Sequence, residues 1–349
     1  MGNQFSYKKA GVDISAADAA KREMAQSVEA ADPRVLNKLG AFATLFDARF
    51  PGYEHPVLVL KTEEPGSKQL LAFRYGHVES ICYDMVNHLI NDIIVMGARP
   101  LSVQDAVICG KLKKSVVTRI VAALAAACRE QGCTLTGGET SEQPGVIPSG
   151  TYILTSSVVG VVEKAKIIDG SAIEVGDAVL AVASNGLHTN GYSLVRALMD
   201  EKPKILKAEV AGESFIDAVL KPHTCYFKAL EGLFDMGEIH GLAHITGGGI
   251  EGNLNRILPE GTNARIDRSL IRILPLFNLI KRMGAVPDAD MLRTFNMGVG
   301  MTIVAKTSAV DTIRRHLADK GHESYSIGEI VRGEKKVEYV NGLKWPKPE

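Results

Sequence analysis

The chain has 349 residues, of which 40 are basic and 40 acidic, and 46% are hydrophobic. This balance excludes the strong basic field that attracts nucleic acid, and no apolar stretch approaches the length of a membrane span. The length leaves room for two packed cores, so we expect two domains. The five cysteines form no C-x-x-C pair and lie mostly in apolar runs, and residues 1–10 lack the hydrophobic segment of a signal peptide. These features favour reduced thiols and a cytoplasmic protein.

The sequence of the first half predicts both helices and strands. Helices are expected over residues 17–31, 77–97 and 115–131, where apolar residues recur at helical spacing. Strands are expected over 56–60, 70–73, 101–108 and 152–162, the first two on either side of a charged loop. Residues 164–176 are interpreted as the connection between domains.

The helix expected over residues 77–97 has one broad apolar face and ends at Gly97. Its other face carries short polar side chains, namely Asp84, Asn87, His88, Asn91 and Asp92. Short carboxylates and amides on a rigid helix suit metal coordination. A solvated face is the alternative, although Lys and Glu usually fill such faces.

The stretch from Thr134 to Gly145 is rich in turn residues. We expect the short strand 133–136 to end at Gly137 and Gly138, followed by Glu139 and Thr140. Paired glycines let backbone amides approach an anion, and a carboxylate placed there could face a metal or a phosphate. A strand-to-loop turn with a solvated glutamate fits the same pattern.

The sequence of the second half predicts strands over residues 178–183, 242–245 and 302–305, and helices over residues 192–199 and 250–257. A turn over 184–191 contains His188 and Asn190. A second glycine turn, Gly247 to Gly249, stands between a strand and a helix, which is an anion-binding arrangement.

Two common nucleotide signatures, the P-loop and the dinucleotide fingerprint, are absent from the sequence. What remains is a set of glycine turns, clustered short carboxylates and one loop lysine, Lys68. This combination favours a phosphate-handling, magnesium-dependent enzyme of a less common fold.

Ordered motifs over nearly the whole chain resemble the phosphoribosylformylglycinamidine cyclo-ligase (aminoimidazole ribonucleotide synthetase) family. The matching segments are residues 7–14, 86–100, 137–145, 186–193, 243–249 and 294–301. The family belongs to a superfamily of ATP-using enzymes that includes selenophosphate synthetase and thiamine-monophosphate kinase.

The resemblance implies an α+β fold of two domains, residues 1–168 and 169–349. It implies N-terminal strands that pair across a homodimer into a barrel, and a C-terminal sheet with helices on one face. The implied reaction converts formylglycinamidine ribonucleotide and ATP into aminoimidazole ribonucleotide, ADP and phosphate, with Mg²⁺.

The resemblance also implies roles for individual residues. Glu63 and Asp92 are expected to contact the metal, and Lys68 to be the phosphate cation. His188 and His244 are expected to act on the substrate, although a histidine in a turn is as often a local hydrogen-bonding residue. The residues expected to bind nucleotide or substrate are Asn91, Asp105, Gly137, Gly138, Glu139, Thr140, Asn190, Gly247, Gly248, Gly249 and Asn296.

One loop departs from the family pattern Asp-Gly-Val-Gly-Thr-Lys, because this chain has Glu63-Glu64-Pro65-Gly66-Ser67-Lys68. Glu64 adds a negative charge, and Pro65 removes an amide donor. Two further hypotheses therefore stay open, namely a divergent superfamily enzyme with another ATP-dependent substrate and a non-catalytic nucleotide-binding paralogue.

Overall fold

The structure is a computed structural model that describes residues 23–24, 32–37 and 42–347. The chain divides into two compact units, of which the first holds residues up to Ile90 together with Pro100–Val161. The second holds Asn91–Arg99 and Val162–Glu349, so the end of one long helix and the turn after it go with the second unit. The helix predicted over 17–31 lies mostly outside the described residues.

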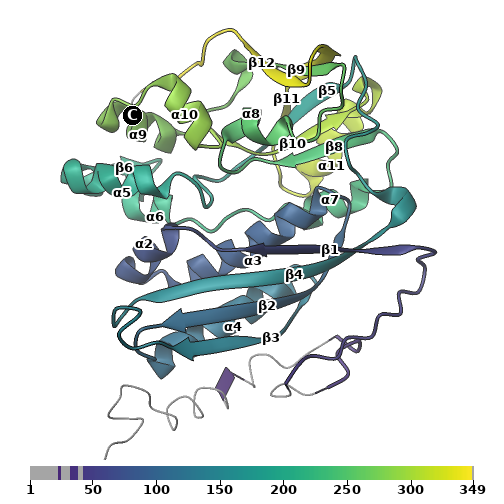
Figure 1. Ribbon diagram of the computed structural model, residues 1–349. Helices are drawn as coiled ribbons and strands as arrows, with labels where there is room; N and C mark the ends of the chain where they lie inside the picture. The colour runs from purple at the N-terminus through teal and green to yellow at the C-terminus, as the bar shows by residue number, and fades with distance from the viewer. Residues whose placement is uncertain (1–22, 25–31, 38–41, 348–349) are drawn as a thin grey trace, which may run out of the picture. The chain divides into compact units, whose positions relative to one another are not determined.

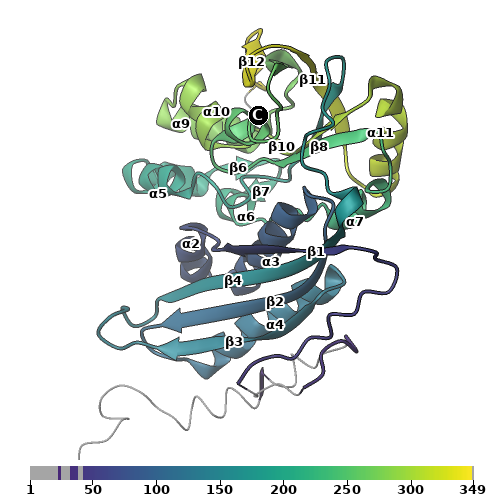
Figure 2. The ribbon, with the colours of Figure 1, turned by 45° about the vertical axis from the view of Figure 1, so that its right-hand side comes forward.

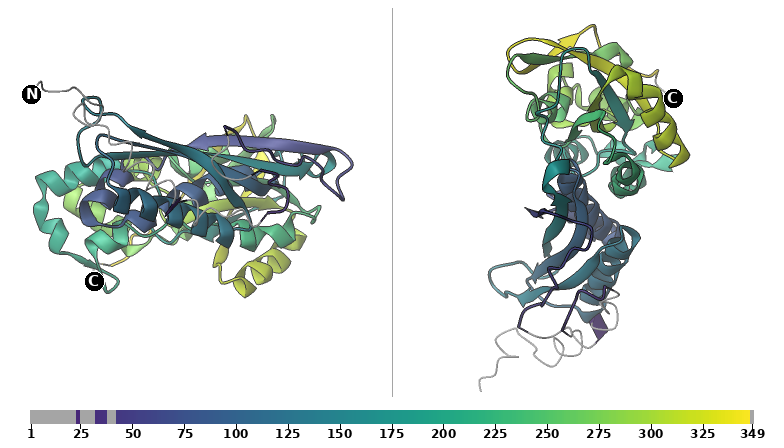
Figure 3. Two further views of the ribbon diagram at one scale, coloured as in Figure 1. Left: turned by 90° about the horizontal axis from the view of Figure 1, so that it is seen from below. Right: turned by 90° about the vertical axis from the view of Figure 1, so that its right-hand side faces the viewer.

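The first unit is built on a four-stranded sheet with the order β1-β4-β2-β3 (Figure 1). Its elements are β1 (Pro56–Glu63), α2 (Lys68–Tyr75), α3 (Val78–Ile94), β2 (Arg99–Cys109), α4 (Lys114–Glu130), β3 (Thr134–Glu142) and β4 (Tyr152–Glu163). The helices α3 and α4 lie against one face of this sheet (Figure 3, right). Both helices bury apolar residues at helical spacing, for example Ile81, Met85 and Leu89 on α3.

Two predictions for this unit are wrong. Residues 70–73 were expected to form a strand, but they lie within helix α2, which buries Leu71 and Ala72 and ends at Gly76 in a left-handed conformation. Gly137 and Gly138 were expected to end a strand, but β3 continues through them to Glu142 and pairs in parallel with β2. The ladder shifts register between Val103 and Gln104, so the glycines accommodate an irregularity inside the strand.

The second unit is built on a six-stranded sheet with the order β12-β9-β11-β5-β10-β8 (Figure 1). Figure 2 shows β12, β11, β10 and β8 of this sheet from a second side. The longer strands are β5 (Ala178–Ala183), β8 (Ile239–His244), β9 (Thr262–Asp267), β10 (Val299–Ala305), β11 (Ser324–Arg332) and β12 (Lys336–Val340). The strands β5 and β10 are almost wholly buried. The pairs β10–β5, β10–β8, β11–β5 and β11–β9 are antiparallel, whereas β12 pairs in parallel with β9. The sheet is therefore mixed.

Helices and short turns complete the second unit. The helices are α5 (Tyr192–Glu201), α6 (Phe215–Val219), α7 (Phe227–Leu230), α8 (Gly249–Leu254), α9 (Pro275–Gly284), α10 (Asp288–Thr294) and α11 (Val310–Asp319). A small hairpin joins β6 (Glu209–Val210) to β7 (Glu213–Ser214). The 3-10 turns are η1 (Lys164–Lys166), η2 (Pro203–Lys207), η3 (Glu231–Leu233), η4 (Arg268–Leu270) and η5 (Thr307–Ala309). The strands predicted at 178–183, 242–245 and 302–305 and the helices at 192–199 and 250–257 are confirmed within a few residues.

Among the described residues, no helix combines the length and the apolar character needed to cross a membrane. The five cysteines are all described, and all are free thiols, four of them buried.

Candidate functional site

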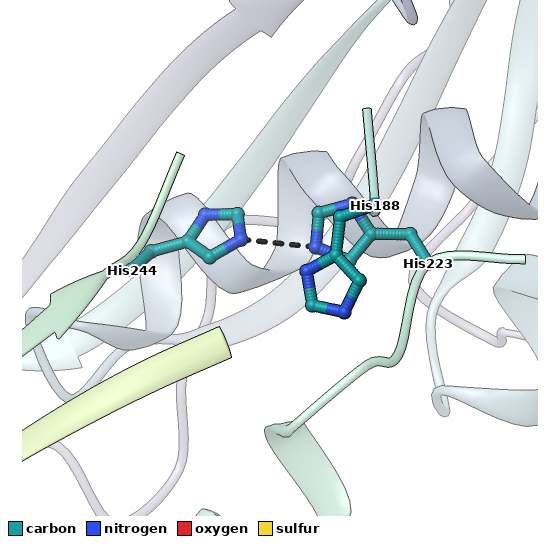
Figure 4. A group of neighbouring side chains, drawn as sticks. All are labelled: His188, His223 and His244. Carbon is teal, nitrogen blue, oxygen red and sulfur yellow. Dashed lines mark hydrogen bonds between the residues drawn. The ribbon is translucent and has the colours of Figure 1, made fainter. Parts of the chain in front are cut away.

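A carboxylate and two imidazoles form a hydrogen-bonded chain in the second unit. Asp92, near the end of α3, has Oδ1 2.7 Å from Nδ1 of His244, the last residue of β8. The Nε2 of His244 lies 3.0 Å from the Nε2 of His223 (Figure 4). Because the carboxylate favours a proton on Nδ1 of His244, a neutral His244 presents its Nε2 lone pair to His223. The arrangement can hold a proton or pass it along the chain.

His188 joins this group by ring stacking. Its ring lies 3.9 Å from that of His223, centroid to centroid, with an interplanar angle of 21° (Figure 4). His188 has a positive φ of 61°, a conformation that is costly for a residue with a side chain and is found often at functional sites. A Cβ on Gly300 would lie 2.8 Å from Cε1 of His188 and closer still to the Tyr226 hydroxyl. The glycine in β10 therefore leaves the space that the imidazole occupies.

Asn91 holds the segment that carries His223. Its Nδ2 donates to the Thr224 carbonyl at 2.8 Å, and its Oδ1 accepts from the Tyr226 amide at 2.9 Å. The Tyr226 hydroxyl in turn donates to the Ala183 carbonyl at 2.8 Å, and burial raises the pKa of this phenol. Asn91 is fully buried, so its amide satisfies backbone groups that would otherwise be unpaired. A direct nucleotide contact of Asn91 stays a prediction.

Asn296 links the turn over residues 184–191 to Gly298, at one end of the six-stranded sheet. It donates to the Gly186 carbonyl at 2.9 Å and accepts from the Ser184 hydroxyl and the Gly298 amide. With 2% of its surface exposed, Asn296 positions the 184–191 turn. Its role as a nucleotide contact is untested.

The structure brings the predicted residues Asn190 and Gly247 together. A Cβ on Gly247 would stand 3.2 Å from the Asn190 Oδ1 atom. Gly248 and Gly249 both have positive φ, and a Cβ on Gly249 would lie 1.9 Å from the Leu292 carbonyl oxygen. Close packing against the end of α10 therefore explains Gly249, whereas the phosphate contact of the turn stays a prediction.

Lys68 and Asp84 form a fully buried ion pair in the first unit. The Lys68 Nζ lies 2.8 Å from both carboxylate oxygens of Asp84, and neither side chain is exposed. Burial lowers the pKa of Lys68, and the attraction of Asp84 opposes this effect. The prediction that Lys68 meets a phosphate is untested, but the structure shows that this lysine also compensates a buried carboxylate.

The polar stripe of α3 is not a solvated face, because Asp84, Asn87, His88 and Asn91 are all buried. The alternative of a solvated face is therefore wrong for these four residues. The metal site that the stripe was expected to form stays a prediction.

Glu63 ends β1 and has a lysine and a histidine near its carboxylate. Its Oε2 lies 2.9 Å from the Lys61 Nζ and 3.9 Å from the His88 Nε2, and 27% of its side chain is exposed. The amide of Glu64 donates to Oε1 at 3.2 Å. Glu63 thus remains partly accessible within the first unit.

Asp105 explains one of the glycines in β3. Asp105 and Gly138 are ladder partners, and a Cβ on Gly138 would lie 2.2 Å from the Asp105 Oδ1. Burial raises the pKa of Asp105 to about 7. Glu139 and Thr140 follow in the same strand, paired with β2, and the Thr140 amide donates to the Glu139 carboxylate at 2.9 Å. Their nucleotide contacts stay predictions.

The sequence analysis did not identify His223 as a candidate site residue and did not identify the partner of Asp84. His223 stands outside any glycine turn, in the run Lys-Pro-His-Thr-Cys-Tyr, and nothing in its neighbours marks it. Its significance comes from contact with His244, 21 positions away. Asp84 was noted only as part of the polar stripe.

Comparison with known proteins places these residues in a family. Residues 53–162 match the AIR synthase related protein N-terminal domain, and residues 174–341 match the corresponding C-terminal domain. The phosphoribosylformylglycinamidine cyclo-ligase of Methylobacillus flagellatus is 41% identical over 94% of this chain and 95% of the relative. The chain belongs to the phosphoribosylformylglycinamidine cyclo-ligase family.

Other members of the family match over similar lengths. The phosphoribosylformylglycinamidine cyclo-ligase of Acetivibrio thermocellus is 40% identical over 95% of this chain and 99% of the relative. The fold is shared more widely, because the hydrogenase maturation protein HypE of E. coli superposes with a TM-score of 0.66 at 16% identity, covering 95% of this chain and 98% of HypE. Thiamine-monophosphate kinase of Stenotrophomonas maltophilia gives a TM-score of 0.64 at 17% identity, covering 91% and 94%. The α+β fold of two domains expected from the resemblance is confirmed, and each domain is built on a mixed sheet.

Proposed function

We propose that this chain closes the imidazole ring of aminoimidazole ribonucleotide from formylglycinamidine ribonucleotide, with ATP converted to ADP and phosphate, in purine biosynthesis. The observation that carries the proposal is the match of about 40% identity over nearly the full length of several cyclo-ligases. The matched family domains, residues 53–162 and 174–341, include the segments that hold Asp92, His188 and His244.

The hydrogen-bonded histidines suit the proton transfers of ring closure. The attacking nitrogen must lose a proton, and a neutral imidazole with a carboxylate behind it is a suitable acceptor. Asp92 stabilises the imidazolium of His244 once that proton arrives. We assign proton handling to His244 and substrate positioning to His188 and Asn190.

The proposed metal ligands are of the chemical type that Mg²⁺ prefers. Glu63 and Asp92 offer carboxylate oxygens, which Mg²⁺ prefers, and their side chains are 27% and 18% exposed, unlike the fully buried Asp84. ATP supplies the phosphoryl group that makes an amide oxygen a leaving group, with Mg²⁺ offsetting its charge. We assign Glu63 and Asp92 to the metal and Lys68 to phosphate. The residues assigned to nucleotide or substrate are Asn91, Asp105, Gly137, Gly138, Glu139, Thr140, Gly247, Gly248, Gly249 and Asn296.

We extend the proposal to quaternary structure and location. Residues 1–168 and 169–349 would be the two domains, with helices on one face of the C-terminal sheet, in a cytoplasmic homodimer whose N-terminal strands close a barrel. Support comes from β1, which is an edge strand with Leu58 52% and Leu60 70% exposed. An edge strand with exposed leucines is suited to pairing with a second copy.

The test is a turnover assay with purified chain, formylglycinamidine ribonucleotide, ATP and Mg²⁺, in which product and ADP are separated by chromatography. We expect equal amounts of aminoimidazole ribonucleotide and ADP, without any need for glutamine. Asp92→Asn should lower turnover by about 100-fold or more, because it removes a carboxylate from both the metal and His244. Asp235→Asn, which removes an exposed carboxylate paired with Lys166, is the control and should retain activity.

Other outcomes would support the competing hypotheses. ADP release only with a different acceptor would indicate a divergent superfamily enzyme. ATP binding without turnover of any superfamily substrate would indicate a non-catalytic paralogue, and either result would overturn the proposal.

A further inference from the structure

Three buried histidines from separate segments meet in the second unit. His188 lies in the turn after β5, His223 in the segment before α7, and His244 at the end of β8 (Figure 4). One ring nitrogen from each can be chosen so that all three atoms lie within 4.8 Å of one another. We propose that His188, His223 and His244 form a binding site for a transition-metal ion of the zinc class, separate in chemistry from the Mg²⁺ of the nucleotide.

The distances require little rearrangement at two of the ligands. Zinc binds imidazole nitrogen at about 2.0–2.1 Å, so two nitrogens on a tetrahedral ion stand about 3.3 Å apart. The Nε2 atoms of His223 and His244 are 3.0 Å apart. For an ion to bind both, the separation of the two nitrogens would have to grow by only a few tenths of an ångström, and the rings would have to turn so that both lone pairs point at the ion.

Asp92 supplies the outer partner that such sites use. A metal-bound imidazole usually donates its other N–H to a carboxylate, which fixes the tautomer and increases the basicity of the ligand. The 2.7 Å contact between Asp92 and Nδ1 of His244 has this geometry, and it leaves Nε2 facing His223. The carboxylate–histidine pair is therefore oriented toward the space between the rings.

The third histidine is held nearby by its backbone. The left-handed backbone of His188 and the absence of a side chain at Gly300 place its ring flat against His223. One of its ring nitrogens lies within 4.8 Å of a ring nitrogen of each of the other two histidines. Three neutral nitrogen ligands select Zn²⁺, Co²⁺, Ni²⁺ or Cu²⁺ over Mg²⁺, which prefers oxygen.

Occupancy of this site would withdraw His188 and His244 from the substrate. This consequence rests on the proposed function, and it makes the ion an inhibitor of turnover. Binding itself does not depend on that function, so the two can be measured apart.

The experiment titrates the metal-stripped full chain with Co²⁺ and follows the visible d–d absorption of a tetrahedral or five-coordinate ion, then displaces it with Zn²⁺. We expect one ion per chain in the wild type. His223→Gln should weaken binding more than about 100-fold, since loss of an outer partner alone costs about 10- to 100-fold. Asp92→Asn removes only the outer partner of His244, so it should weaken binding by about 10- to 100-fold.

The matched control is His240→Gln. His240 is also buried, and its Nδ1 lies 2.7 Å from the Asp177 Oδ2, in a second group that includes Glu174. If His240→Gln abolishes binding while His223→Gln does not, or if the wild type binds less than one ion per chain, the proposal is overturned. Should His223→Gln fail to fold by circular dichroism, His188→Asn replaces it, because asparagine tolerates the left-handed backbone, and it must weaken binding by at least tenfold. Zn²⁺ binding without inhibition would leave the site standing and count against the proposed role of these histidines in turnover.

Discussion

Replacing Lys68 by Met should destabilise the first unit strongly, before any effect on catalysis. Lys68 Nζ is 2.8 Å from both oxygens of Asp84, and both side chains are completely buried. Methionine retains most of the apolar stem and removes the charge. The carboxylate of Asp84 would then be buried without the cation that compensates it.

The expected cost follows from the burial of the pair. Breaking a buried ion pair by removing one partner costs about 3–5 kcal/mol, whereas an exposed pair contributes about 0–1 kcal/mol. Arg119→Met is the matched control in the same unit, because its bidentate pair with Glu79 is about half exposed on both sides. Replacing both partners by Lys68→Met/Asp84→Leu should recover most of the loss, since an apolar pair leaves no charge uncompensated.

The assay is urea unfolding without nucleotide, followed by circular dichroism, with ATP affinity measured separately by calorimetry. We expect Lys68→Met to lose several kcal/mol, Arg119→Met to lose about 1 kcal/mol or less, and the double variant to lie near the wild type. A Lys68→Met variant as stable as the wild type but unable to bind ATP would refute this reasoning. It would show that Lys68 acts on phosphate and not on Asp84.

Three further predictions test other parts of the molecule. Burial raises the pKa of Asp105 to about 7, above the value near 4 of an aspartate in an unfolded chain. Both states are protonated below about pH 3, and stability falls as the pH rises from there toward 7, because only the unfolded chain ionises in that range. Asp105→Asn should therefore match the wild type at about pH 3 and exceed it by up to about 4 kcal/mol at about pH 8 in thermal unfolding. Equal stability at both pH values would contradict the shift. Gly249→Ala should lower the free energy of unfolding by about 1–3 kcal/mol more than Gly248→Ala does in urea unfolding, because only a Cβ at position 249 would collide with the Leu292 carbonyl. A larger loss for Gly248→Ala would show that the packing argument fails. Glu63→Gln should raise the Mg²⁺ concentration needed for half-maximal turnover, since an amide is a weaker ligand than a carboxylate, and an unchanged magnesium dependence would remove Glu63 from the metal.

The sequence predicts elements well where a long periodic pattern exists. The helices α3 and α4 and the strand β5 are found within a few residues of their expected bounds, because a wide apolar face can be buried in only one way. The short run 70–73 is helical instead, since four apolar residues fit either period and the surrounding fold decides. The paired glycines at 137 and 138 are inside a strand, where Asp105 of the neighbouring strand requires the absence of a side chain at Gly138.

The candidate site is less predictable, because its contacts join distant positions. His244 could be found from its glycine-rich neighbourhood, but its partners Asp92 and His223 stand 152 and 21 residues away. No local spacing encodes those distances. Asn296 matched a family segment, yet the structure alone shows that its amide links Ser184, Gly186 and Gly298.

The end of helix α3 accounts for the polar residues that seemed out of place on an otherwise apolar helix. Asn91 binds backbone groups on both sides of Cys225, and Asp92 orients the imidazole of His244. A solvated lysine or glutamate at either position could not do this, because its longer side chain would leave the buried backbone groups unpaired or turn the carboxylate away. The same two residues therefore fix the loop that carries His223 and the tautomer of His244, so that any chemistry at the histidines, whether proton transfer or metal binding, depends on the last turn of this helix.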